Sequence, residues 1–145
     1  IGDAKEAADI KPFRRADLGS VSEAAAAKAA LAGVDIRGKT VALDYSVARH
    51  VIKYHGAAAV EGTRERAMTG RHLMDAHHYF NTASHIRRSG EGRDGMPRLE
   101  AEGRDENGDR IRVIVDVSSK RLALVTMLNP TDGGRKSAKA ARSRK

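Results

Sequence analysis

Residues 110–128 read RIRVIVDVSSKRLALVTML and contain two strand-like patterns joined by a polar turn. In the first pattern every second residue is apolar, as in a strand with one buried face: Ile111, Val113, Val115 and Val117. The second pattern, residues 122–128, is apolar almost throughout, which predicts a strand covered on both faces. Residues 118–121 supply the turn, so this stretch predicts two neighbouring antiparallel strands.

The residues just before this stretch also favour strands. Asn107-Gly108 is typical of a type I′ hairpin turn, and residues 98–102 alternate weakly in hydrophobicity. Residues 91–109 hold seven acidic and three basic side chains, which we expect in the hairpin loops.

The N-terminal half of the chain favours helices. Ser22 can cap an alanine-rich helix over residues 23–32, whose helix propensity is very high. A short strand is expected over residues 39–43.

Further along, Asp44 can cap a second helix over residues 45–55. We expect a mobile connector over residues 56–70 and a third helix over residues 71–81. Residues 82–90 are expected to end in a short strand.

Because the helices precede most of the strands, the sequence predicts an α+β fold with N-terminal helices packed on a small antiparallel β-sheet. Residues 1–17 are expected to be an arm or linker, and residues 18–130 the folded domain. Residues 131–145 carry six basic side chains and one acid, which is typical of a disordered basic tail. The chain begins with Ile1 rather than Met, as expected of a processed chain or a piece of a longer one.

Composition narrows the classes of function. The 145 residues include 27 Lys and Arg against 19 Asp and Glu, and the net charge of +8 favours a polyanionic partner, either nucleic acid or an acidic protein. The chain has no cysteine, which excludes a disulfide framework, a zinc finger and a thiol nucleophile. No apolar run approaches the about 18 residues of a membrane span. Aromatic residues make up only 3% of the chain, which argues against a platform on which bases stack.

The helix expected over residues 45–55 carries two histidines suited to acid–base chemistry. Its apolar stripe includes His55, which therefore points towards the core or a cleft, and His50 lies at the edge of that stripe. Two imidazoles can divide general-base and general-acid work near neutral pH. RNA cleavage needs such a pair but no metal or other cofactor, because the 2′-hydroxyl of the substrate is the nucleophile. The alternative is that His55 is a satisfied core residue.

Thr126 is the single polar residue within its apolar run. Its hydroxyl can donate to a phosphate if it faces a cleft, and otherwise Thr126 is an ordinary β-branched packing residue. Arg112 alternates to the polar side of its strand and can reach towards the same cleft. Lys120 and Arg121 lie in a turn, where solvation is the default.

Four further histidines have no assigned role: His72, His77, His78 and His85. Their spacing is not that of the HExxH zinc motif, and adjacent histidines on a helix diverge by about 100°. We therefore expect surface or capping histidines and no metal site.

Two segments carry a family resemblance: LDYSVARHVIKYHG, residues 43–56, and RIRVIVDVSSKRLALVTMLNP, residues 110–130. With the alanine-rich helix before them, they resemble phage-encoded toxin domains of the barnase, EndoU, colicin and RelE-like ribonuclease group. Such domains often lie at the C-terminus of MuF-type phage head proteins or other polymorphic toxins. The family pattern has H-x-x-K-x-H in a helix and a Thr in the last strand of a curled antiparallel sheet. The matching residues are His50, Lys53, His55 and Thr126.

The resemblance implies a metal-independent endoribonuclease that acts on tRNA or mRNA and leaves a 2′,3′-cyclic phosphate. The expected catalytic residues are His50, His55 and Thr126. The expected substrate-binding residues are Lys53, Arg112, Lys120 and Arg121. The resemblance also implies a cognate immunity protein, a larger carrier polypeptide or phage particle, and delivery by a phage or a secretion system into the target-cell cytoplasm.

Two other functions fit part of the sequence. A non-catalytic domain of a phage head or ejected protein would bind nucleic acid through its basic surface and tail, with a steep salt dependence. An ADP-ribosyltransferase toxin would need an aromatic-rich nicotinamide pocket, which the small number of aromatic residues disfavours.

Overall fold

The computed structural model describes residues 14–92 and 95–130, and within these ranges the chain has an α+β fold with one six-stranded sheet. The strands are β1 (Arg15–Ser20), β2 (Thr40–Asp44), β3 (His85–Glu91), β4 (Pro97–Arg104), β5 (Arg110–Val117) and β6 (Arg121–Leu128). The helices are α2 (Glu23–Leu31), α3 (Tyr45–His55), α4 (Ala57–Val60), α5 (Gly70–Met74) and α6 (Ala76–Asn81). The predicted α+β class is confirmed.

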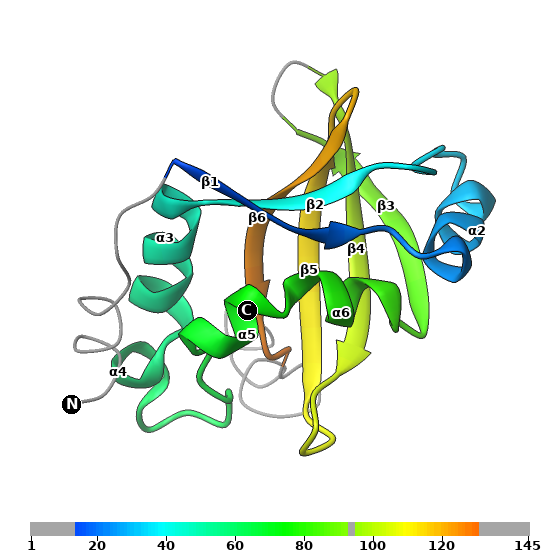
Figure 1. Cartoon of the computed structure of the whole chain (residues 1–145). Helices are drawn as coiled ribbons and strands as arrows, with labels where there is room; N and C mark the ends of the chain where they lie inside the picture. The colour runs from blue at the N-terminus through cyan, green and yellow to red at the C-terminus, as the bar shows by residue number, and fades with distance from the viewer. Residues whose placement is uncertain (1–13, 93–94, 131–145) are drawn as a thin grey trace, which may run out of the picture.

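The strand order is β1-β2-β6-β5-β4-β3 (Figure 1). Strands β2 and β6 are parallel, and every other neighbouring pair is antiparallel. The expectation of helices first and an antiparallel sheet afterwards therefore differs from the structure in two ways. The first two strands alternate with α2 and α3 along the chain, and β2 pairs with β6 in parallel.

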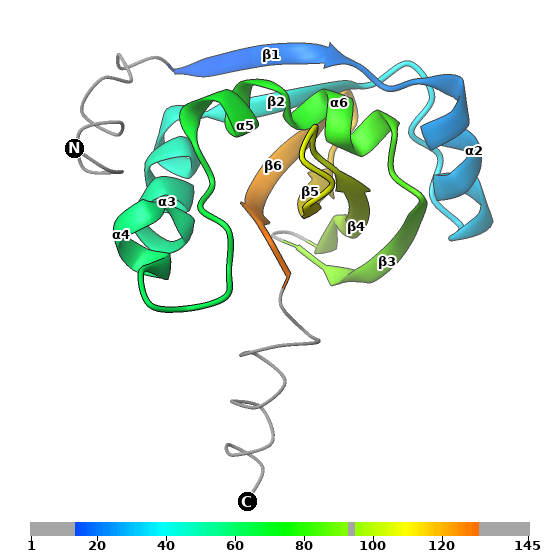
Figure 2. The same ribbon diagram turned by 90° about the horizontal axis from the view of Figure 1, so that it is seen from below.

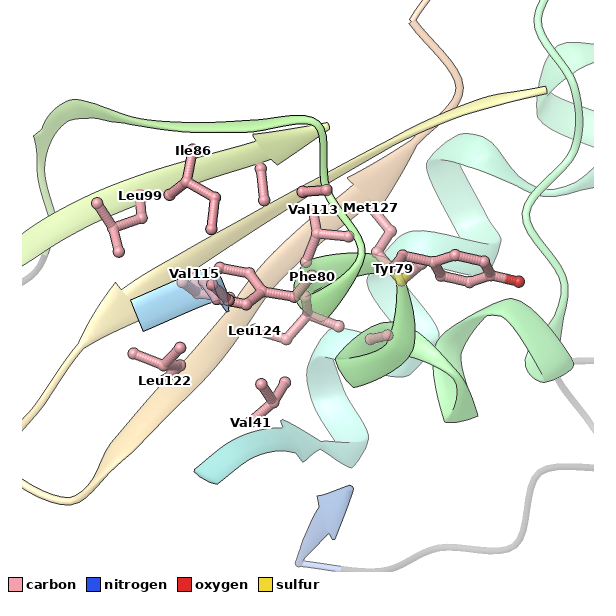
Figure 3. Packing of buried hydrophobic residues seen from close by; sticks show 14 of the residues in the cluster. Val41, Tyr79, Phe80, Ile86, Leu99, Val113, Val115, Leu122, Leu124 and Met127 are labelled. Carbon is pink, nitrogen blue, oxygen red and sulfur yellow. The ribbon is translucent and has the colours of Figure 1, made fainter. Parts of the chain in front are cut away.

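Helix α6 lies between the β1–β2 end of the sheet and the strands β4 and β5, and it contacts both (Figure 2). Its Phe80 is fully buried among side chains from β2, β4, β5 and β6 (Figure 3). Helix α2 packs on β3, and α3 packs beside β6. The core therefore fills the side of the sheet that faces α6.

The two predicted N-terminal helices form where the local sequence places them. The Ser22 side chain caps α2 by accepting a hydrogen bond from the Ala25 N–H at 3.1 Å. Helix α3 ends at His55, immediately before Gly56, and Asp44 occupies its N-cap position without a side-chain capping bond.

Residues 71–81 form two short helices rather than the single helix that we expected. Helix α5 ends before Asp75, and α6 begins after it. A capping box between Thr69 and His72 starts α5. The change of direction at Asp75 lets α6 bury Tyr79 and Phe80 in the core.

The connector over residues 56–70 contains α4 and is bonded to the rest of the fold. The Met68 N–H donates to the His55 carbonyl at 2.7 Å, and the Arg66 N–H donates to Asn129 Oδ1 at 2.8 Å. Met68 is fully buried. These contacts do not support the expected mobile connector.

Strand β6 is not covered on both faces as expected. Its residues alternate between buried and half-buried, with one interruption. Ile114 pairs with Thr126, but the next residue, Val115, pairs with Leu124, so Val125 is an extra residue in a β-bulge. The sequence of β6 suggested burial of both faces because the outward residues of this strand are also mostly small or apolar, although only one face is buried.

Not all of the acidic residues at 91–109 lie in loops. Glu100 and Glu102 lie within β4, and Glu100 is buried. Their side chains are on the sheet because residues 98–104 alternate between the two faces. The expected loop position is therefore wrong for both residues.

The predicted hairpin between β4 and β5 forms, but its turn is longer than a two-residue type I′ loop. The Gly108 N–H donates to the Asp105 carbonyl at 2.9 Å, which places Glu106 and Asn107 at the centre of the turn. The Asp105 carboxylate also accepts a hydrogen bond from the Asn107 N–H. Gly108 has a φ of +84°, a conformation that favours glycine.

The boundary of the expected arm also shifts. Residues 15–17 belong to β1, because Arg15 pairs with Asp44 of β2. Residues 1–13 of the expected arm and the expected tail at 131–145 lie outside the described residues.

Candidate active site

The face of β3–β6 opposite the core carries a network of ion pairs on β3, β4 and β5, and we call the whole face the polar face. Residues alternate between the two faces of each strand, so the residues next to these charged ones in sequence point into the core and are mostly apolar and buried. Four arginines and three carboxylates pair with one another across this face: Arg87, Arg98, Arg110, Arg112, Glu100, Glu102 and Asp116. One positive charge is in excess.

The strand register places three reactive side-chain types in one row of the polar face. His85 of β3 pairs with Glu102 of β4, and Glu102 pairs with Arg112 of β5. Side chains on directly opposite residues of antiparallel strands have Cβ atoms about 5 Å apart. An imidazole, a carboxylate and a guanidinium are therefore consecutive neighbours across three strands.

Glu102 is held on two sides. Arg110 contacts its Oε2 through Nε at 2.8 Å and Nη2 at 2.6 Å, and Arg112 Nη2 contacts its Oε1 at 3.2 Å. Burial alone would raise the pKa of Glu102, but the hydrogen bonds and charges of the two arginines outweigh it and hold the pKa below its usual value. Glu102 is therefore ionised at neutral pH.

The next row of the polar face contains Glu100 between Arg87 and Thr126. Arg87 Nη2 lies 2.9 Å from Glu100 Oε2, and Arg112 Nε lies 3.1 Å from the same oxygen. On the other side, Ile114 separates Glu100 from Thr126. Arg112 thus bridges both carboxylates of β4.

One polar atom of this face is buried without a partner in the described part of the chain: Thr126 Oγ1. Buried polar groups are almost always bonded, so this hydroxyl needs an explanation. Arg112 Nε, on the adjacent strand, makes no well-aligned hydrogen bond but is ion-paired with Glu100 Oε2. An anion that entered this face could accept a hydrogen bond from the Thr126 hydroxyl.

Pockets lie at both ends of the polar face. One of about 270 Å³ is lined by Ser84, Glu102 and Arg110 among others. The second, of about 440 Å³, lies between the sheet and the start of α3, and its lining includes Arg98 and Asp116. These two residues form a bidentate ion pair, with 2.7 Å between Arg98 Nε and Asp116 Oδ1 and 3.2 Å between Nη2 and Oδ2. The hydrogen bonds to Asp116 raise the pKa of Arg98.

The structure brings together only two of the residues expected in the site. Thr126 and Arg112 both lie on the polar face. His55 instead bonds to Glu65 of the connector, with 2.9 Å between Nδ1 and Oε2. His50 is exposed and its ring contacts that of Tyr54 in a tilted arrangement, with 4.8 Å between ring centroids.

His50 and His55 project from α3 in different directions. Five residues of α-helix turn through about 500°, which leaves the two side chains about 140° apart round α3. Thr126 Oγ1 has no partner among the described residues, so neither imidazole bonds to it. No hydrogen bond in the described residues joins these three side chains, and their grouping in one site stays a prediction.

The remaining expected substrate-binding residues are separated. Lys53 is exposed on α3, where its Nζ lies 5.3 Å from the centre of the Tyr54 ring. Lys120 is exposed in the turn between β5 and β6. Arg121 Nε lies 3.7 Å from Asp17 Oδ1 of β1.

The histidines without an assigned role have different settings. His72 bonds to Thr69 and lies 3.4 Å from Asp105 Oδ2 through Nε2. The His77 ring packs against Gly19, and His78 is exposed. Within the described ranges, no group of three or more His, Asp or Glu side chains could hold a metal ion.

Sequence reasoning missed Glu100, Glu102 and His85. The signal was present in the two-residue spacing of Arg98, Glu100, Glu102 and Arg104, which places four charged side chains on one face of a strand. Arg110, Arg112 and Asp116 repeat this pattern in the next strand. His85 could be placed only from the register between β3 and β4.

No protein-family model matches the chain, and no curated protein or solved structure matches it either. No helix in the described residues is long and apolar enough to cross a membrane.

Proposed function

We propose that the protein is a metal-independent endoribonuclease and that the polar face of β3–β6 is its active site. The observation that carries this proposal is the row of His85, Glu102 and Arg112 on adjacent strands. Cleavage of RNA through its own 2′-hydroxyl requires a base, an acid and a cation beside one phosphate. This row supplies one of each.

The proposed reaction has balanced proton transfers. The Glu102 carboxylate takes the proton of the 2′-hydroxyl, and the 2′-oxygen forms a bond to phosphorus. The bond between phosphorus and the 5′-oxygen breaks, and protonated His85 gives its proton to that oxygen. The products are a 2′,3′-cyclic phosphate and a free 5′-hydroxyl. Arg112 stabilises the negative charge of the phosphorane.

The local contacts suit these roles. Ser84 Oγ lies 3.3 Å from His85 Nδ1, which orients the ring and leaves Nε2 for the leaving group. Two arginines hold the pKa of Glu102 down, so the carboxylate is ionised and can accept a proton, while the same shift makes it a weaker base than a free glutamate. Thr126, with its buried and unpaired hydroxyl, can donate to a phosphate oxygen on the same face.

The partners implied by the resemblance belong to the same proposal. If RNA is the substrate, the producing cell needs an immunity protein that covers the polar face. Delivery into a target-cell cytoplasm by a larger carrier, a phage particle or a secretion system would follow from the same toxin role.

The direct test is incubation of cellular RNA with the purified protein in EDTA, followed by analysis of the new ends. We expect 2′,3′-cyclic phosphates from the wild type. His85→Ala and Glu102→Gln should each slow cleavage by roughly 10²–10⁴-fold, the usual contribution of a positioned acid or base. The matched controls are His78→Ala on α6 and Glu106→Gln in the β4–β5 hairpin, both at exposed positions.

Two outcomes would contradict the proposal. If the wild type leaves RNA intact both in EDTA and in Mg²⁺, the proposed enzyme activity is refuted. That result would favour the alternative of nucleic-acid binding without cleavage. Loss of cleavage in His50→Ala or His55→Ala, with full activity in Glu102→Gln, would move the active site to α3, as the family resemblance implies.

A further inference from the structure

The aromatic side chains that the core of the described chain does not bury are both on one helix: Tyr54 is exposed and Tyr45 is half-buried. The whole sequence has only three Tyr and two Phe. Tyr79 and Phe80 are buried in the core, and Phe13 lies outside the described residues. The remaining two, Tyr45 and Tyr54, are both on α3, and Tyr54 is 53% exposed.

Basic side chains accompany these rings. Lys53 Nζ lies 5.3 Å from the centre of the Tyr54 ring, and Arg49 Cζ lies 6.0 Å from the centre of the Tyr45 ring. The His50 ring, from the preceding turn, lies against the Tyr54 ring at an interplanar angle of 47°. Helix α3 itself contains no Asp or Glu, so its exposed side attracts anions.

Four residues of α3 follow one line along the helix, and we call them the α3 stripe: Ser46, His50, Lys53 and Tyr54. Their spacing of three or four residues places them on one side, away from the buried residues of α3. At about 1.5 Å per residue, the stripe is about 12 Å long.

The α3 stripe begins where the polar face ends. Ser46 and Val47 line the 440 Å³ pocket together with Arg98 and Asp116 of the polar face. The same pocket is lined by Met96 and Val125, which give it apolar walls. A chain that leaves the polar face through this pocket therefore reaches His50 and then Tyr54.

We propose that the α3 stripe binds the single-stranded RNA that extends from the polar face, with a base stacked on Tyr54 and phosphates near Lys53 and His50. This inference rests on the proposed RNA cleavage, because that activity places the strand on the polar face. It assigns to His50 and Lys53 a role in holding substrate away from the reacting phosphate.

Single-stranded RNA fits the stripe better than a duplex does. Exposed rings with neighbouring cations bind unstacked bases, whereas the bases of a duplex are stacked on each other and are not free to lie on a tyrosine. The low aromatic content argued against a broad stacking platform. The exposed Tyr54 provides a single stacking position rather than a platform.

The test uses a 2′-O-methylated RNA strand of about 12 nucleotides, a length within the usual site size, because it cannot be cleaved through its 2′-oxygens. We expect Tyr54→Leu to raise its Kd about fivefold or more, since loss of one stacked base has effects of this size. Lys53→Gln should reduce the slope of log Kd against log salt by about 0.7. Lys28→Gln on α2 is the matched control, with the same chemical change at a distant helix (Figure 1).

Cleavage of a dinucleotide separates this inference from the proposed function. A dinucleotide is too short to reach the stripe, so Tyr54→Leu should cleave it at the wild-type rate while cleaving long RNA more slowly. If the wild type cleaves neither RNA but Tyr54→Leu still weakens binding, the proposed function fails and the stripe stands as a binding site. If Tyr54→Leu and Lys53→Gln both bind the strand as the wild type does, the stripe is refuted.

Discussion

Gly19 of β1 packs directly against His77 of α6, and this contact gives a sharp prediction. A Cβ added at Gly19 would lie 2.9 Å from His77 Cγ and closer still to Cδ2. Ordinary van der Waals contact begins at 3.4 Å, so the ring or the strand must move to make room. The φ of Gly19 is not in the left-handed region, so the cost of Gly19→Ala comes from this contact alone.

The expected magnitude follows from overpacking at a close contact. Such changes usually cost about 1–3 kcal/mol of unfolding free energy. In a His77→Ala background the space is open, and alanine in a strand is favoured over glycine by about 0.5–1 kcal/mol. Gly19→Ala should therefore destabilise the wild type but be neutral or stabilising when His77 is absent.

Urea unfolding followed by far-ultraviolet circular dichroism measures all four corners of this double-mutant cycle. We expect a coupling energy of at least about 1 kcal/mol between Gly19→Ala and His77→Ala. The control cycle replaces His77→Ala with His78→Ala, whose side chain is exposed, and it should be additive. Additive effects in the His77 cycle would refute the packing of β1 on α6.

Three further perturbations test other parts of the fold. Phe80→Ala should lower the unfolding free energy by about 3–5 kcal/mol in the same urea assay, because the ring is fully buried. Asn129→Ala should cost about 2 kcal/mol or more, since its amide joins the connector at Arg66 to the Arg110 carbonyl at 2.8 and 2.7 Å. Glu102→Gln should make the free energy of unfolding fall less steeply as the pH is lowered into the acid range. The lowered pKa of Glu102 means that its stabilisation is present above its unfolded pKa and is lost as pH falls through its folded pKa. Urea titrations between pH about 6 and about 3 would detect this, and an unchanged curve would contradict it.

The sequence was most informative where structure depends on neighbouring residues. The cap at Ser22 placed the start of α2, and the helix expected over residues 45–55 matches α3, because helix ends are determined within one turn. The alternation in β5 also predicted its buried face, since Ile111 and Val113 are fully buried. Each of these signals lies within a few residues of its effect.

The sequence was least informative where distant segments meet. The break at Asp75 depends on the core that receives Phe80, and the bulge at Val125 depends on the register with β5. The candidate site has the same origin, because His85 and Glu102 are 17 positions apart and meet only through the pairing of β3 with β4. The spacing of two histidines on a single helix suggested His50 and His55 instead. Their side chains point about 140° apart round that helix, because they are five positions apart in the sequence.

The composition of the polar face is hard to explain by stability alone. Paired charges that are largely removed from water gain little over apolar side chains of the same volume, because the loss of hydration offsets their attraction. Side chains such as Val, Ile or Thr would cover the outer face of β4 and β5 at no such cost. The four arginines exceed their three carboxylate partners by one charge, and Thr126 Oγ1 is buried with no hydrogen-bond partner among the described residues. An anion bound on the polar face near Arg112 and Thr126 would balance the excess charge and accept a hydrogen bond from that hydroxyl. Added inorganic phosphate should then raise the midpoint of thermal unfolding of the wild type more than that of Arg112→Gln, and an equal effect on both proteins would show that the polar face binds no anion.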